Sequence, residues 1–135
     1  PLLVTMTYTS CQYSCPMTLK KLEVIENKIK DAKYKNYKIA VISFDTVRDT
    51  PERFRQYMKE KNLDPSRYVF LRSKDKSKVR EIAVHLGINY KEESGNEFSH
   101  SNMITLLDKK GVIAQQINGI GGDPTDLINK LVQIK

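Results

Sequence analysis

The sequence of 135 residues has no tryptophan, only two cysteines and two histidines, and no long apolar run. A membrane span needs about 20 consecutive apolar residues, so none is predicted in this stretch. A secretory signal is not recognisable either. The chain is nevertheless long enough to bury a core without cross-links, so its two thiols are not needed to hold it together.

Both cysteines stand in one short segment, TSCQYSCP, where Cys11 and Cys15 are four positions apart and a proline follows. A disulfide between them closes a very short loop, and short loops stabilise least in the chain-entropy model. A structural disulfide is therefore the weakest interpretation. A redox couple and a metal site both stay open at this point.

The net charge of +7 is carried mostly by lysines that are spread along the predicted helices. The sequence lacks the compact basic block, or the interleaved basic and aromatic residues, that is typical of nucleic-acid binding. A solvated lysine-rich surface is the simplest interpretation, and an acidic partner protein is the next. We expect a monomer without a nucleic-acid partner.

Strand-like and helical segments alternate along the chain. Apolar, β-branched runs predict strands at 2–8, 37–44 and 67–71, followed by a hairpin made of NMITLLD and VIAQQIN. Apolar residues at three- and four-residue steps, with start and stop signals, predict helices at 16–33, at 51–62, before Gly87 and after Asp123-Pro124. Residues 89–101 are polar and are predicted to form a loop.

This order implies parallel strands joined by right-handed crossovers, with an antiparallel hairpin at the edge. It is the plan of a thioredoxin-like α/β fold, with a mixed central sheet, flanking helices and a C-terminal hairpin plus helix. We predict a single domain over residues 1–135. Because the chain opens directly on a buried strand, we also expect that residues upstream of Pro1 are missing.

The cysteines are predicted to lie between the first strand and the first helix, with Cys15 just before the first helical turn. The carboxyl ends of strands in open α/β sheets are where ligands gather. Unpaired N–H groups at a helix start favour negative charge and should lower the thiol pKa values. Thiolate is both a nucleophile and a metal ligand, so this argument supports the redox and the metal interpretations equally.

A metal site needs a third ligand, and His100 is the better of the two histidines. It directly precedes a core strand whose start should lie beside the first helix, whereas His85 belongs to the surface of a predicted helix. One imidazole and two thiolates suit Cu(I), and zinc is also compatible. The exposed alternative, a loop histidine in water, stays open.

The segments TSCQYSCP, VISFDTVRDTPE and FSHSNMITLLDKKG together resemble the Sco/SenC family of copper proteins, in the same order and over nearly the whole chain. The resemblance implies a membrane-tethered, thioredoxin-like metallochaperone that binds a copper ion, Cu(I) or Cu(II), through Cys11, Cys15 and His100. It implies a role in assembling the dinuclear copper centre of cytochrome c oxidase. The partner is then the copper-receiving oxidase subunit or another copper or thiol client.

The resemblance further implies that Asp45 and Asp49 lie near the metal as supporting residues, although Asp49 also fits a helix-start role. It implies an extracytoplasmic location, periplasmic in a bacterium or in the mitochondrial intermembrane space. Family members usually have an anchor and additional strands before the first strand of this chain. We expect those parts upstream of Pro1.

Two enzymatic alternatives compete with a copper carrier. The cysteine pair could be a thiol-disulfide oxidoreductase with Cys11 as the attacking thiol. A peroxiredoxin-type peroxidase needs a threonine and an arginine beside the cysteine, for which Thr9 with Arg48 or Arg72 are candidates. The methionines are best explained by core packing, and only Met17, two residues after Cys15, is a candidate for further soft ligation.

Overall fold

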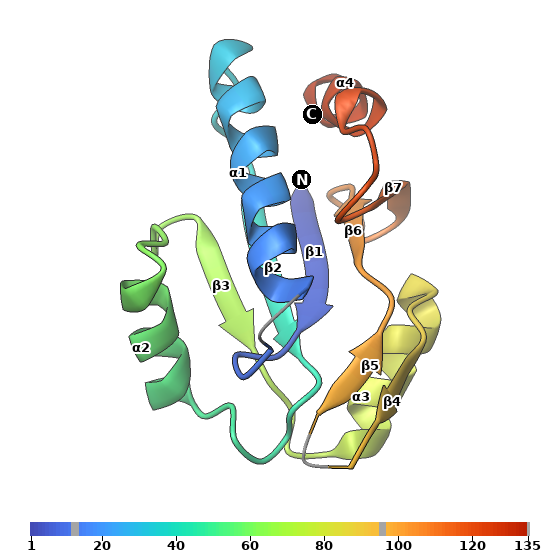
Figure 1. Ribbon diagram of the computed structural model, residues 1–135. Coiled ribbons are helices and arrows are strands. Elements are labelled where there is room, and N and C mark those ends of the chain that lie inside the picture. The colour runs from blue at the N-terminus through green and yellow to red at the C-terminus, as the bar shows by residue number, and fades with distance from the viewer. Residues whose placement is uncertain (12–13, 95–96, 135) are drawn as a thin grey trace.

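The computed structural model describes residues 1–11, 14–94 and 97–134, and its centre is a five-stranded sheet in the order β3-β2-β1-β6-β7. The first three strands in chain order are parallel neighbours, and the last two run antiparallel at the other side of β1. The predicted mixed sheet is confirmed (Figure 1). Its strands are β1 (Leu2–Thr7), β2 (Lys38–Ser43), β3 (Tyr68–Leu71), β6 (Met103–Leu107) and β7 (Ile113–Asn118).

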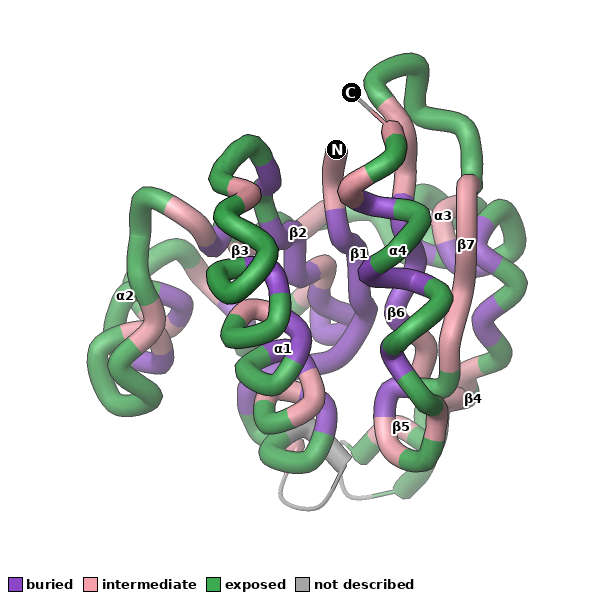
Figure 2. Tube along the Cα trace, turned by 90° about the horizontal axis from the view of Figure 1, so that it is seen from above, coloured by how far each residue is buried: buried purple, intermediate pink, exposed green. Residues whose placement is uncertain are grey.

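Four helices flank the sheet: α1 (Ser14–Asp31), α2 (Pro51–Glu60), α3 (Lys76–Leu86) and α4 (Thr125–Gln133). Successive residues of a strand face opposite sides, and β1 shows this directly. Leu3 packs in the core with α1 and α4, whereas Val4 packs in the core with α3. The sheet therefore lies between α1 and α4 on one face and α3 on the other, and buried residues gather along it (Figure 2).

The bounds of α1 and α2 lie within two residues of the predicted ones, and one of the differences concerns the cysteines. Thr50 caps α2 by accepting a hydrogen bond from the Arg53 N–H at 3.2 Å, and Gly87 ends α3 in the left-handed conformation at φ 69°. Helix α1 begins at Ser14, two residues earlier than predicted. Cys15 consequently lies within the first turn of this helix and not before it.

The prediction of a loop at 89–101 is wrong, because this segment forms a small hairpin beside the main sheet. β4 (Tyr90–Glu92) pairs antiparallel with β5 (Phe98–His100), and Tyr90 stands opposite His100. Tyr90 and Phe98 pack against the apolar core on the α3 face. The rings of Tyr90 and Phe98 therefore anchor a segment whose other residues are mostly polar.

Burial on the inner face of α1 should account for much of the stability. Ile25, on the inner face of α1, is completely buried, whereas its neighbour Val24 is 42% exposed. We expect Ile25→Ala to lower the free energy of unfolding by about 2–5 kcal/mol, because it removes buried methylenes and leaves a cavity. Val24→Ala is the matched control and should change it by less than about 0.5 kcal/mol. Urea denaturation measures both, and equal losses would contradict the assigned helix face.

Candidate metal centre

Cys11 lies at the end of a tight turn that follows β1. Its backbone N–H donates to the carbonyl oxygen of Tyr8 at 3.1 Å, which closes a four-residue turn. The side chain is half-buried and packs against the core on the α3 face. This position fits the predicted site at the carboxyl ends of the parallel strands, where a thiol is anchored but is still reached by solvent.

The start of α1 supplies the electrostatic setting for the second cysteine. Cys15 is the second residue of the helix, and the first turn contains no acidic residue. The partial positive charge of the helix start is therefore not offset by a carboxylate within that turn, which favours a thiolate there. The side chain of Cys15 lies outside the described part of the structure, so its predicted pairing with Cys11 stays a prediction.

His100 is the last residue of β5 and is half-buried. Its Nδ1 lies 3.1 Å from the carbonyl oxygen of Ser101. A carbonyl oxygen only accepts hydrogen bonds, so this contact favours the tautomer with the proton on Nδ1. The imidazole lone pair is then on Nε2, and a backbone partner on the other nitrogen is the usual way in which a metal-binding histidine is oriented.

Aromatic rings hold His100 next to the turn that carries Cys11. The ring centroids of His100 and Phe44 are 4.9 Å apart, and those of His100 and Tyr8 are 6.1 Å apart at an interplanar angle of 75°. Tyr8 is also the residue whose carbonyl closes the Cys11 turn. Cys11 and His100, which are far apart in the sequence, therefore both contact the cluster that contains Tyr8 and Phe44.

The hydroxyl of Tyr8 adds a polar clamp on the hairpin. It accepts a hydrogen bond from the Phe98 N–H at 3.1 Å and lies 3.4 Å from the Phe98 carbonyl oxygen. The rings of the two residues are tilted against each other at 5.0 Å. Tyr8 thus fixes the strand that carries His100, two residues away from the imidazole.

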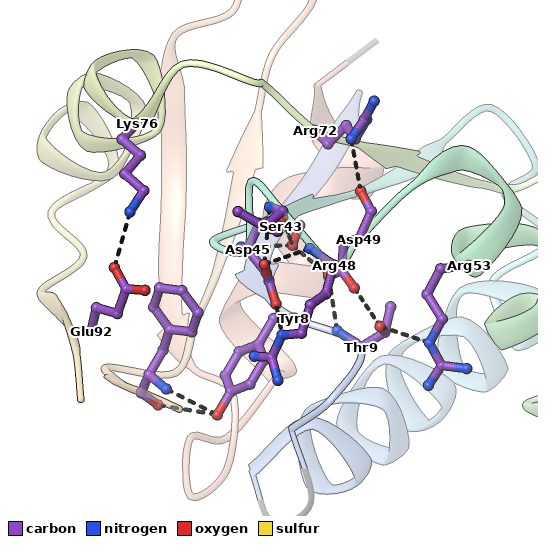
Figure 3. Close-up of polar contacts among 12 residues, drawn as sticks. Tyr8, Thr9, Ser43, Asp45, Arg48, Asp49, Arg53, Arg72, Lys76 and Glu92 are labelled. Atoms are coloured by element: carbon purple, nitrogen blue, oxygen red, sulfur yellow. Dashed lines mark hydrogen bonds and ion pairs between the residues drawn. The ribbon is translucent and has the colours of Figure 1, made fainter. Parts of the chain in front are cut away.

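Asp49 is fully buried and joins the ends of β1 and β2 (Figure 3). Its Oδ2 accepts from the Thr9 N–H at 3.0 Å and from the Ser43 hydroxyl at 2.5 Å, and its Oδ1 accepts from the Thr9 hydroxyl. Arg53 Nε donates to the same threonine hydroxyl at 3.1 Å. Asp49 is therefore not a helix-start decoration: its carboxylate holds the residue two positions before Cys11.

Asp45 is also buried, but its carboxylate organises its own loop. It accepts from the backbone N–H groups of Val47 and Arg48 at 3.1 and 2.9 Å, and Arg48 Nε lies 2.5 Å from its Oδ2. Arg48 and Thr9 were considered above for peroxide chemistry. In the structure Arg48 pairs with Asp45, and Thr9 donates to Asp49. Arg72, the other candidate, lies 3.5 Å from the Asp49 carbonyl oxygen.

The described residues do not by themselves complete a metal site. Within the described part of the chain, no three side chains of histidine, cysteine, aspartate or glutamate converge as a metal-binding group. Cys11 and His100 lie in the same region, and Asp45 and Asp49 lie behind it with their oxygens engaged by the protein. The donor set of Cys11, Cys15 and His100 has the chemistry that suits copper, and it stays a prediction.

Several residues that build this region were missed in the sequence. Tyr8 and Phe98 form the clamp on the hairpin, and the Phe44 ring packs tilted against His100. Ser43 donates a further hydrogen bond to Asp49. The spacing of Phe98 and His100, with one residue between them, was the available signal of a short strand. Core packing is a wrong explanation for Met17, because its side chain is 52% exposed at the start of α1.

The comparisons with known proteins agree on one family. The sequence model described as SCO1/SenC matches residues 1–135. No curated protein matches this chain significantly in sequence. Among solved structures, a SCO1/SenC family lipoprotein from Bacillus anthracis superposes with a TM-score of 0.88 at 17% identity, over 98% of this chain and 80% of that one.

Two further solved structures bear on the chemistry of the family. BsSco, described as a member of the Sco family of cytochrome c oxidase assembly proteins with a disulfide switch, has a TM-score of 0.83 at 21% identity, over 98% of this chain and 78% of its own. ScoI of Bradyrhizobium japonicum, crystallised with copper bound, has a TM-score of 0.73 at 25% identity, over 99% of this chain and 84% of its own. The thioredoxin-like Sco fold is confirmed.

Asp49 should be essential for the stability of the Cys11 turn. We expect Asp49→Asn to lower the free energy of unfolding by about 2–3 kcal/mol, because the amide places an NH2 group against buried donors. Asp31→Asn, at the exposed end of α1, is the control and should have little effect. Chemical denaturation monitored by circular dichroism measures both variants. An Asp49→Asn protein as stable as the control would contradict the role assigned to the buried carboxylate.

The Tyr8 hydroxyl should hold the His100 strand. Tyr8→Phe keeps the ring but removes the acceptor of the Phe98 N–H, at a net cost of about 0.5–1.5 kcal/mol. The Phe98 amide should therefore exchange with deuterium faster, by roughly two- to tenfold. Tyr34→Phe is the control, because its hydroxyl lies 3.5 Å from the Ile134 carbonyl oxygen, far from the hairpin in sequence. Unchanged exchange at Phe98 would show that ring packing alone orders the strand.

Proposed function

This chain belongs to the SCO1/SenC family, and we propose on that basis that it is a copper carrier of the Sco type. In this proposal Cys11, Cys15 and His100 bind one copper ion, which the protein delivers to the dinuclear copper site of cytochrome c oxidase. Copper is the cargo, and the protein is more a metallochaperone than an enzyme. The observation that supports the proposal is that Tyr8 contacts both segments: its carbonyl closes the Cys11 turn, and its ring packs edge-on against His100.

The described geometry supports ligation in three ways. The Ser101 carbonyl directs the His100 lone pair to Nε2. The Asp49–Thr9 contacts fix the chain just before Cys11, and the first turn of α1, free of acidic residues, favours a thiolate at Cys15. Two thiolates and one imidazole are soft ligands that bind Cu(I) well and also accept Cu(II).

A three-ligand site also explains how copper could leave. Fewer than four protein ligands keep one side of the ion open, so the thiolates of a partner can attach before those of this chain dissociate. The ion then moves by stepwise ligand exchange. Oxidation of Cys11 and Cys15 to a disulfide removes two ligands and releases the ion, so an oxidant would gate the carrier.

Membership of the family supports a proposal for the partner protein and for the cellular location. We propose the copper-receiving subunit of cytochrome c oxidase, or another copper or thiol client, as the partner on an extracytoplasmic membrane face or in the mitochondrial intermembrane space. The similar Bacillus anthracis protein is a lipoprotein. In the described part of this chain, no helix has the length and apolar character of a bilayer span.

The alternative function is thiol-disulfide exchange, which the disulfide switch named for BsSco favours. The Cys11 thiolate would attack a client disulfide and release one client thiolate, forming a mixed disulfide. Attack by Cys15 would then release the second client thiolate and leave a Cys11–Cys15 disulfide. Two electrons pass from the cysteine pair to the client, and no metal takes part.

Replacing His100 separates the two functions. We expect His100→Ala to weaken Cu(I) binding by at least about tenfold, because loss of an outer-shell partner alone costs about 10–100-fold in metal affinity and His100 is proposed as a direct ligand. Competition against a colorimetric Cu(I) chelator measures the affinity of the reduced protein. His85→Ala is the matched control, because His85 is exposed on α3, and it should bind copper like the unmodified chain.

The exchange reaction is measured in parallel on a small disulfide reagent. Cys11→Ser should abolish both copper binding and exchange, whereas His100→Ala should spare most of the exchange rate. If His100→Ala binds Cu(I) as tightly as His85→Ala, the carrier proposal fails. If the unmodified chain also binds no copper but reduces the disulfide reagent, the oxidoreductase function replaces it.

A further inference from the structure

A groove of about 370 Å³ lies between the start of α3 and the β4–β5 hairpin. We define it as the α3 groove by its lining residues, which are Phe44, Lys76, Ser77, Val79, Arg80, Tyr90, Glu92 and Phe98. Three of them are aromatic, and two are basic. None of the three proposed copper ligands is among these lining residues.

The aromatic wall of the α3 groove is shared with the candidate metal centre. Phe44 stacks on Tyr90 with ring centroids 4.5 Å apart at 30°, and its ring centroid also lies 4.9 Å from that of His100. Phe98, two residues before His100, is the third aromatic residue of the wall. Phe44 therefore contacts His100 and also lines the groove.

The rim of the α3 groove is basic on its α3 side. Residues 72–80 contain five lysines and arginines but one acidic residue, Asp75, which caps α3 by accepting from the Ser77 N–H at 2.8 Å. The hairpin side differs, because residues 90–98 contain three glutamates. An acidic ligand is therefore attracted to the α3 side, where Lys76 and Arg80 line the groove.

Arg80 is already ordered for binding. Its guanidinium lies 4.0 Å from the centroid of the Tyr90 ring and donates to the Tyr90 carbonyl oxygen at 3.1 Å. A side chain held in place by a ring and a hydrogen bond loses less freedom when it pairs with a ligand. Arginine in such a setting is well suited to carboxylates.

Among the lining residues, Glu92 is acidic, and a carboxylate of a ligand can compete with it for Lys76. Glu92 pairs with Lys76 at 3.3 Å, but the two side chains are 48% and 69% exposed (Figure 3). An exposed ion pair contributes little to stability. A carboxylate of a partner can therefore take the place of Glu92 at Lys76 at small cost.

We propose that the α3 groove docks an acidic segment, with an aromatic or aliphatic anchor residue, of the protein that exchanges copper with this chain. The basic rim meets the acidic side chains, and the aromatic wall takes the anchor. Charge complementarity of this kind steers association and fixes orientation. The docked partner then lies beside His100, where its own ligands can reach the ion. This inference rests on the proposed copper function for the identity of the partner.

The test uses two synthetic peptides and the reduced, copper-free chain of 135 residues. One peptide has a phenylalanine flanked by glutamates, and the other has glutamines in place of the glutamates. Titration followed by ¹⁵N–¹H NMR should shift the amides of Lys76–Arg80 and Tyr90–Glu92 with the acidic peptide only. Shifts centred elsewhere, or equal shifts with both peptides, would overturn the proposal.

Charge variants give a second readout of the same binding. We expect K76E/R80E to bind the acidic peptide at least about tenfold more weakly, because two attractive contacts become repulsive. K76Q, which leaves the Arg80–Tyr90 stack intact, should weaken it by a smaller factor. K109E/K110E, a matched reversal of exposed lysines in the β6–β7 turn, is the control and should bind like the unmodified chain. Equal weakening in the control would reduce the effect to net charge and overturn the proposal.

Two further measurements separate the groove from the alternatives. If the chain binds phosphatidylglycerol vesicles through Lys76 and Arg80 but does not bind the peptide, the groove is a lipid contact and the proposal fails. Cu(I) binding is measured on K76E/R80E and should be unchanged. A chain that binds copper but no peptide loses the groove alone, whereas one that binds the peptide but no copper loses the proposed function and the copper-exchanging partner with it.

Discussion

The carboxylate of Asp49 joins the ends of two strands that are far apart in sequence. It accepts hydrogen bonds from Thr9, after β1, and from Ser43, at the end of β2, within a fully buried setting. A buried charge is tolerated only when its oxygens are hydrogen-bonded, so the carboxylate and its partners stabilise one another. Thr9 lies inside the turn that ends at Cys11, so this carboxylate supports the position of the first thiol.

A second group of contacts places the imidazole, and it is aromatic instead of ionic. Phe44 and Tyr8 pack against His100, while the Tyr8 hydroxyl holds the neighbouring strand. The aspartate network and the aromatic cluster meet in the segment Tyr8–Thr9. The segments of Cys11 and His100, two of the three proposed copper ligands, are therefore both held by adjacent residues at the end of one strand.

The sequence was informative wherever a periodic pattern is long, and silent where order depends on distant partners. The first two strands and the helices have apolar patterns over six or more residues, so their existence and the parallel pairing of the strands were predictable. The β4–β5 hairpin has strands of three residues each, too short for a pattern, and it is ordered by Phe44 and Tyr8. Cys11, Cys15 and His100 could be selected by residue type. That Asp49 binds Thr9, 40 positions away, could not, because nothing local distinguishes a buried carboxylate from a helix-start residue.

Tyr8 couples the ordering of the Cys11 turn to the ordering of the strand that carries His100. Its carbonyl closes the turn of Cys11, and its hydroxyl and ring restrain the strand of His100. Ordering of one segment and ordering of the other are then linked quantities, and linkage is reciprocal. A ligand that orders the Cys11 segment would therefore also order the hairpin, and ordering of the hairpin would strengthen binding at the Cys11 segment by the same coupling free energy.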